Sequence, residues 1–350
     1  MSRMEFELNC PIPISEYPII TMAHGSGGKL SHQLIDKMFR PMFDNEILEE
    51  GHDGAVLDVP AGKIAFTTDS FVVNPIFFPG GNIGDLAVNG TVNDLACCGA
   101  NPLYLSVGMI LEEGLAMEDL WKICLSIREA AQDAGVRIVT GDTKVVDRGH
   151  GDKIFINTSG IGIIPENVRI DPRSTGEGDV IIINGNIGDH GVAILSAREG
   201  LEFESAIQSD TAALNDMVGE ILKTTNKISV LRDPTRGGVA TTLNEISASA
   251  GAGIVLEEEL LPVSNQVRGA CEVLGLDPLY IANEGKILVI VPGDLAEDVL
   301  AVMKQHKLGS DSAIIGKVTA EHPGVVRMIT SIGSSRVIDM LTGDQLPRIC

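Results

Sequence analysis

The chain has few aromatic and few basic residues. Aromatic side chains make up 4% of its 350 residues, with one tryptophan, so we expect an aliphatic, alanine-rich core. Lysine and arginine number 26 against 48 aspartates and glutamates, which gives a net charge of −22. A surface of this charge repels nucleic-acid backbones and anionic membranes, so neither is an expected partner.

Several targeting and metal-binding signals are also absent from the sequence. No apolar stretch is long enough to span a bilayer, and residues 1–10 form no signal-peptide pattern, so we expect a cytoplasmic protein. The six cysteines contain no CxxC pair, which excludes a metal finger. Cys97 and Cys98 are adjacent, and a disulfide framework is not expected in the cytoplasm. No three residues follow Cys350, which excludes a prenylation signal.

The length of the chain suggests two domains of ordinary size. Prolines interrupt residues 1–20, which we expect to form an irregular extension. The segment after residue 164 is polar and carries proline and glycine, which indicates a domain boundary. Helical and strand patterns alternate without regular βαβ spacing, and this predicts α+β domains with mixed sheets. The expected division is an N-terminal domain over 21–165, a second domain over 166–338 and a mobile tail over 339–350.

A glycine-rich loop, HGSGGK, occupies residues 24–29 and leads into a helical pattern over 30–43. Glycines let backbone N–H groups approach an anion closely. The loop is neither a Walker A sequence nor GxGxxG, so its alternative interpretation is a flexible entry turn.

Three aspartates in the first half are candidate metal ligands. Asp69 and Asp142 follow short apolar β-runs, and Asp94 lies in a small-residue helix expected over 84–98. Carboxylates at strand ends suit Mg²⁺, which bridges them to phosphates. Each alone is more often a turn or cap residue, but three beside a glycine-rich loop are a stronger signal. Asp53 is a weaker fourth candidate.

Other charged residues could take part in chemistry or could have an ordinary structural role. Lys144, two residues after Asp142, could hold phosphate or lower the pKa of a docked thiol, or it is a solvated loop lysine. Asp233 or Thr235 is expected to cap a helix that begins near residue 238. Glu284, just before a strand pattern, could be a general base if partly buried, although a glutamate there is usually exposed.

Cys350 is the last residue of the sequence. A thiol reacts as its thiolate, and the adjacent terminal carboxylate disfavours that form. A functional Cys350 would therefore need to dock into a cationic or base-equipped site. The alternative is an incidental surface cysteine.

Motifs along nearly the whole chain, from about His24 to Cys350, resemble the HypE family of carbamoyl dehydratases in nickel–iron hydrogenase maturation. They are AHGSGGK, FTTDSFVVNPIFFPGGNIG, NDLACCGANP, ILEEGL, VTGDTKVV, DPTRGGV, ANEGK and the terminal PRIC. This family is related to AIR synthetase, selenophosphate synthetase and thiamine monophosphate kinase. The resemblance implies an ATP-binding α/β domain that dimerises, followed by a second α/β domain.

The resemblance also implies a set of site residues. ATP and Mg²⁺ would be held by Asp69, Asp94 and Asp142. The glycine-rich loop near the phosphates would contribute His24, Gly25, Gly27 and Gly28. Glu284 would be the base, and Lys144 would orient the substrate or stabilise developing charge. The first domain would form a homodimer, an expectation that the small, apolar residues over 84–98 also support.

The implied reaction takes place on Cys350. A HypF-type carbamoyltransferase carbamoylates its sulfur, ATP phosphorylates the thiocarboxamide oxygen, and phosphate leaves to give a thiocyanate. The cyano group then passes to iron on a scaffold complex of the HypC–HypD type. A mobile tail suits transfer between a buried site and a partner.

Two other functions use the same features. An ATP-dependent small-molecule kinase or synthetase of the same fold would use the aspartates without Cys350. A catalytically silent scaffold would bind maturation partners through the acidic surface. ATP turnover, and its dependence on carbamoylated Cys350, separates the three functions.

Overall fold

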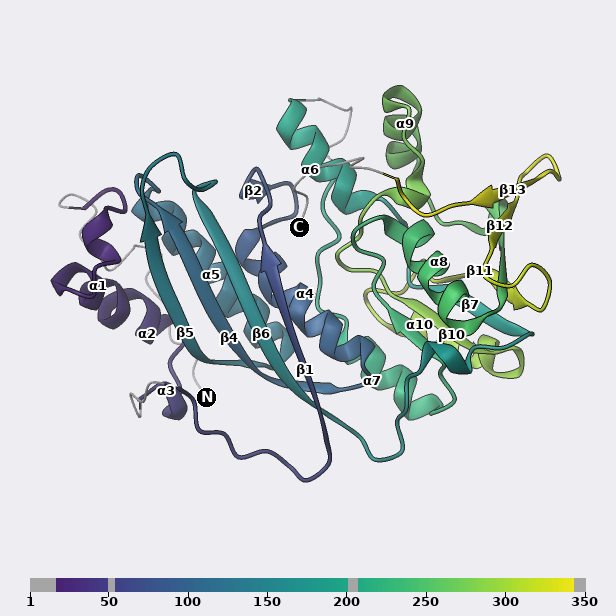
Figure 1. Ribbon diagram of the computed structural model, residues 1–350, viewed down its shortest axis with the longest axis horizontal. Coiled ribbons are helices and arrows are strands. Elements are labelled where there is room, and N and C mark those ends of the chain that lie inside the picture. Colours follow the sequence, from purple (N-terminus) through teal and green to yellow (C-terminus); the bar gives the residue numbers. More distant parts are fainter. Residues whose placement is uncertain (1–16, 50–53, 201–206, 343–350) are drawn as a thin grey trace.

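Helices and strands alternate along the chain and build two halves, each around one β-sheet (Figure 1). The computed structural model describes residues 17–49, 54–200 and 207–342. The first half contains η1 (Met22–His24), α1 (Lys29–Leu34), the π-helical η2 (Ile35–Phe39), α2 (Arg40–Met42), α3 (Glu46–Glu49), β1 (Lys63–Phe71), β2 (Phe77–Phe78), β3 (Gly81–Asn82), α4 (Ile83–Cys97), β4 (Asn101–Glu112), α5 (Met117–Ala134), β5 (Arg137–Val146) and β6 (Ile154–Ile164). The second half contains η3 (Pro172–Ser174), β7 (Asp179–Ile183), α6 (Asp189–Glu199), α7 (Asn215–Thr224), β8 (Val230–Arg232), α8 (Gly238–Ala250), β9 (Gly253–Glu257), η4 (Glu258–Leu260), α9 (Asn265–Leu274), η5 (Pro278–Tyr280), β10 (Leu288–Pro292), η6 (Gly293–Leu295), α10 (Ala296–Gln305), β11 (Ala313–Thr319), β12 (Val326–Ile329) and β13 (Ser335–Ile338).

Both large sheets are mixed. The four-stranded sheet has the order β1-β6-β4-β5, and the seven-stranded sheet has the order β13-β12-β9-β11-β7-β10-β8. β4 pairs with β5 in parallel, and β12 pairs with β9 in parallel, while their other neighbours are antiparallel. The predicted α+β class with two domains and mixed sheets is therefore confirmed. Across the described residues, no helix is both long enough and apolar enough to cross a membrane.

The two faces of the four-stranded sheet differ. In β4 every second side chain from Leu105 to Leu111 is buried, and α4 and α5 pack on this face (Figure 1). The opposite face is open in the described chain. Its apolar side chains Ile64, Phe66 and Ile110 are 54%, 68% and 45% exposed.

Helix α4 is buried almost entirely by its own chain. Its small residues allow close approach: a Cβ on Gly84 would lie 2.5 Å from the carbonyl oxygen of Ile123, and one on Gly90 would lie 2.9 Å from the Phe71 ring. The small apolar residues over 84–98 therefore pack within the chain, and the homodimer stays a prediction.

The strands of the second sheet are apolar because helices cover both faces. Ile181 and Ile183 of β7 belong to one core together with residues of α8. Ile182, between them, belongs to a second core with residues of α7 and α10. This three-layer arrangement explains the unbroken apolar run that the sequence shows there.

Asp69 and Asp142 lie inside strands rather than at their ends, contrary to expectation. β1 stays paired with β6 as far as Phe71, which lies opposite Ile156. β5 stays paired with β4 as far as Val146. Asp69 and Asp142 therefore lie within paired strands and not in the turns that follow them.

Two other local expectations also need correction. Helix α8 is capped by Gly237, at φ 76°, and not by Asp233 or Thr235, since this turn needs the left-handed conformation. The end of the expected irregular extension is ordered. Ile20 is fully buried, and its N–H donates to the Leu115 carbonyl oxygen at 2.7 Å.

Candidate functional site

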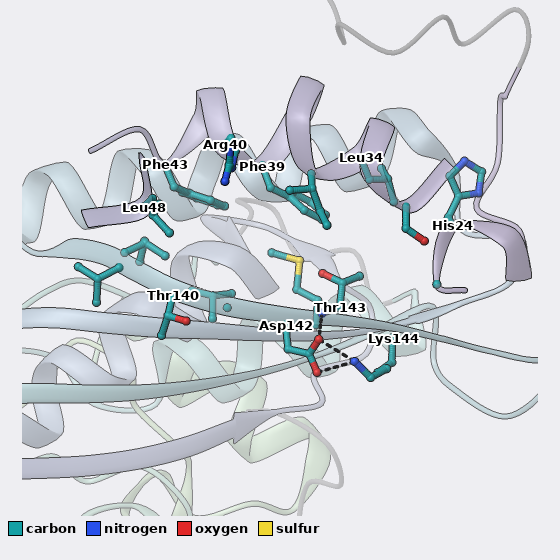
Figure 2. A pocket seen from close by; sticks show the side chains of 18 of the residues that line it. His24, Leu34, Phe39, Arg40, Phe43, Leu48, Thr140, Asp142, Thr143 and Lys144 are labelled. Carbon is teal, nitrogen blue, oxygen red and sulfur yellow. Dashed lines mark hydrogen bonds and ion pairs between the residues drawn. The ribbon is translucent and has the colours of Figure 1, made fainter. Parts of the chain in front are cut away.

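A cavity of about 430 Å³ lies between the N-terminal helices and strand β5 (Figure 2). Apolar side chains, including Leu34, Phe39 and Phe43, line its helical side. Asp142 and Lys144 line it from β5. A cavity of this size with an apolar wall and a few polar groups has the dimensions of a small-ligand site.

The glycine-rich loop contributes to this cavity through His24, Gly25 and Gly27. Gly25 is pressed against β5, because a Cβ there would lie 2.7 Å from the backbone nitrogen of Val145. The Gly27 N–H donates to Ser31 Oγ at 2.9 Å. Gly28 caps α1 and does not line the cavity.

His24 is buried at the edge of the loop. Its Nδ1 lies 3.1 Å from the Thr21 backbone nitrogen, whose N–H donates to it. Burial lowers the pKa of His24, which favours the neutral imidazole. His24 therefore shapes the loop as a neutral acceptor.

Lys144 and Asp142 form an ion pair on the exposed part of β5. Lys144 Nζ lies 2.7 Å from each carboxylate oxygen of Asp142. The hydrogen bond from Lys144 lowers the pKa of Asp142. Lys144 is thus a strand residue and not the loop lysine of the plain interpretation.

A second group of carboxylates lies where α4 meets the second half of the chain. Asp94 Oδ2 accepts a hydrogen bond from Thr67 Oγ1 at 2.8 Å, and burial, with repulsion from Asp69, raises the pKa of Asp94. Burial and then repulsion from Asp94 raise the pKa of Asp233 to about 6. Cys97 Sγ donates to Asp233 Oδ1 at 3.7 Å.

Glu284 is part of this carboxylate group and is 3% exposed. Burial, followed by repulsion from Asp233 and Asp210, raises the pKa of Glu284 well above its ordinary value. Within the described residues, its Oε1 is buried without a hydrogen-bond partner. The usual exposure of a glutamate before a strand does not hold here, and the carboxyl group is suited to exchange a proton.

The structure separates the predicted site residues into two groups. Asp69 and Asp94 lie together with Glu284, whereas Asp142 and Lys144 lie beside the glycine-rich loop. Asp69 and Asp142 are on opposite edge strands, β1 and β5, which are three strand spacings or about 14 Å apart. Among the described residues, no three His, Cys, Asp or Glu side chains could hold a metal ion together. The three-aspartate metal set stays a prediction, and Cys350 lies outside the described residues.

Asp210, Lys286 and Asp233 are the site neighbours that the sequence did not reveal. Asp210 Oδ1 accepts the Glu284 N–H at 3.0 Å, and Asp210 Oδ2 lies 3.0 Å from Lys286 Nζ. Asp210 is far from Glu284 in the sequence and belongs to no recognisable motif. For Asp233 the signals were a helix-cap pattern and its place at the start of DPTRGGV, and neither gave it a role beside Glu284.

The two halves of the chain match two family models. The N-terminal domain of AIR synthase related proteins matches residues 51–164, and the C-terminal domain matches residues 176–329. The fold and its two sheets thus define an AIR synthase related protein.

Similarity to characterised proteins is also high. The chain is 52% identical over 332 residues to a carbamoyl dehydratase HypE from Cupriavidus necator, covering 95% of each chain. A crystal structure of hydrogenase maturation protein HypE in complex with ATP is 50% identical, with a TM-score of 0.91, over 94% of this chain and 99% of that one. A crystal structure of a HypE–HypF complex is also 50% identical, with a TM-score of 0.78, over 88% and 99% of the two chains. The chain therefore belongs to the carbamoyl dehydratase HypE family.

Proposed function

We propose that the protein is an ATP-dependent carbamoyl dehydratase that converts the S-carboxamide on its own Cys350 into a thiocyanate, which supplies the cyanide ligand of a nickel–iron hydrogenase. The ATP complex of the solved relative supports the use of ATP. The observation that carries the proposal is Glu284, a buried carboxyl group with a raised pKa and an oxygen free of hydrogen bonds in the described structure.

The residues present suit ATP and Mg²⁺. The apolar wall of the cavity suits a nucleotide base, while the loop of His24, Gly25, Gly27 and Gly28 and the ammonium of Lys144 suit phosphate oxygens. Mutual repulsion of partly buried carboxylates, as at Asp94, is relieved by a divalent cation. We assign Mg²⁺ to Asp69 and Asp94. Asp142, on the opposite edge strand β5, is assigned to the nucleotide site beside the glycine-rich loop.

The chemistry at Cys350 needs a leaving group and a base. The amide oxygen leaves with the γ-phosphoryl group of ATP as phosphate, ADP is released, and the nitrogen loses two protons as the carbon–nitrogen triple bond forms. Glu284 in its ionised form accepts one of these protons, because its raised pKa makes the carboxylate a stronger base, and the departing phosphate carries away the other. Lys144 orients the thiocarboxamide. To do so, its ammonium group must leave the Asp142 carboxylate and bind the substrate instead.

Partners follow from the reaction and from the exposed surface. A HypF-type carbamoyltransferase would transfer the carbamoyl group to Cys350, and an iron-binding scaffold of the HypC–HypD type would receive the cyano group. The solved HypE–HypF complex supports the carbamoyltransferase as a partner. A second copy of the chain would cover the open face with Ile64, Phe66 and Ile110. We divide the chain into an extension over 1–20, a first domain over 21–165, a second domain over 166–338 and a tail over 339–350. We expect the protein to act in the cytoplasm.

Intact-mass spectrometry tests this function. The protein is incubated with carbamoyl donor, carbamoyltransferase and ATP, and we expect the carbamoyl adduct on Cys350 to lose the mass of one water. Cys350→Ala should bind ATP as the wild type does but acquire neither mass. ATP turnover by Cys350→Ala with a soluble acceptor would favour the kinase, and a wild type that never turns over ATP would favour the scaffold.

A further inference from the structure

Helix α4 carries a polar stripe that faces the second half of the chain. Asn89, Asn93 and Cys97 are four residues apart, so they lie on one side of the helix. Asn89 Nδ2 donates to Thr211 Oγ1 at 3.2 Å, and Cys97 Sγ donates to Asp233 at 3.7 Å. Asn93, between them, has the most extensive contacts of the three.

Asn93 is 1% exposed and makes three hydrogen bonds to backbone groups of the second half. Its Nδ2 donates to the carbonyl oxygens of Ala212 at 3.0 Å and Glu284 at 3.1 Å. Its Oδ1 accepts the Leu214 N–H at 2.8 Å. Both amide protons and one oxygen lone pair are therefore used, and each bond joins segments far apart in sequence.

These contacts hold Glu284 from two sides. Asn93 binds its carbonyl oxygen from the first half, and Asp210 binds its N–H from the second half at 3.0 Å. The residue after Asn93 is Asp94, whose carboxylate turns toward Thr67 of β1. One turn of a buried helix thus fixes Glu284 and Asp94 relative to each other.

We propose that Asn93 is a positioning residue that sets the distance between the base Glu284 and the carboxylates Asp69 and Asp94. This inference rests on the proposed function, because it gives Asn93 a purpose only if Glu284 and the aspartates act on one substrate. Reacting groups must be held closely, and a displacement of about 1 Å can lower a rate about 100-fold.

Substitution of Asn93 by aspartate tests the proposal. Asn93→Asp preserves size but replaces the two donated hydrogen bonds by repulsion between its carboxylate and the Ala212 and Glu284 carbonyl oxygens. We expect the single-turnover rate of water loss from carbamoylated Cys350 to fall about 10- to 100-fold, with the dissociation constant and KM for ATP nearly unchanged. The matched control is Asn89→Asp, one turn earlier on the same stripe. Its carboxylate can accept from the Thr211 hydroxyl where Asn89 donates to it, so this variant should keep nearly the wild-type rate.

Further variants distinguish the possible outcomes. Asn93→Ser is smaller and keeps one hydroxyl donor, so it should fold if Asn93→Asp does not, and its rate should fall less. The positioning role would be overturned if the soluble Asn93 variants dehydrated Cys350 at the wild-type rate. It would also be overturned if Asn89→Asp lost as much of this rate as Asn93→Asp. An equal loss of ATP affinity and rate would also overturn it, since that result indicates general damage. Glu284→Gln is measured alongside: a wild-type rate there would refute the base itself, whereas a slow Glu284→Gln with fast Asn93 variants refutes only the inference.

Discussion

Asp233 should make the protein less stable as the pH rises, and Asp233→Asn should remove this effect. The pKa of Asp233 is raised from 3.8 to about 6 in the fold. The folded state therefore binds more protons than the unfolded state between these values, so the free energy of unfolding falls as pH rises through this window. The difference of about two pKa units corresponds to about 3 kcal/mol, since one unit is about 1.4 kcal/mol.

Urea unfolding of the nucleotide-free protein at several pH values between 4 and 7.5 measures this effect. We expect Asp233→Asn to gain up to about 3 kcal/mol of stability over the wild type between pH 4 and 7, because asparagine stays neutral. Asp171→Asn is a control without the same pH dependence: Arg173 lowers the pKa of Asp171, so the contribution of this carboxylate is complete above its unfolded pKa of 3.8 and is lost only at lower pH. Its difference from wild type should therefore stay nearly constant over most of the measured pH range. If the difference between Asp233→Asn and wild type does not change with pH, Asp233 is ionised in the fold and the reasoning is refuted.

Two further predictions concern the nucleotide and the dimer. Asp94→Asn and Asp142→Asn should each weaken Mg–ATP binding by about tenfold or more in calorimetric titrations. The affinity for ATP without Mg²⁺ should change less. Unchanged affinity in both variants would show that the nucleotide site lies elsewhere. Phe66→Glu places a charge on the open face of the first sheet and should convert a dimer into a monomer in sedimentation experiments, whereas Val273→Glu on the exposed side of α9 should leave the dimer intact. A wild type that sediments as a monomer at micromolar concentration would refute the dimer.

The sequence predicted the positions of helices and strands better than the contacts that they make with distant parts of the chain. Periodicity placed the helix over 84–98 almost as α4 lies. Such positions depend on near neighbours in the chain, which a pattern reports directly.

What the sequence could not reveal depends on contacts between the halves. The burial of Glu284 and the raised pKa of Asp233 arise from residues that are distant in the chain. The separation of Asp142 from Asp69 follows from strand order, which adjacent motifs do not contain. One signal was available: Asn89 and Asn93 interrupt an apolar helix at helical spacing, and buried amides require partners.

The close packing of α4 also affects how sequence variation in this family should be interpreted. At Gly84 and Gly90 any side chain would meet Ile123 or Phe71, so substitutions there will be rejected even though neither glycine takes part in chemistry. The residues that touch the second half, Asn93 and Cys97, will be constrained by the opposing surface. Invariance along this helix is therefore not evidence of catalysis, and paired changes across the two halves identify functional coupling better than invariance does.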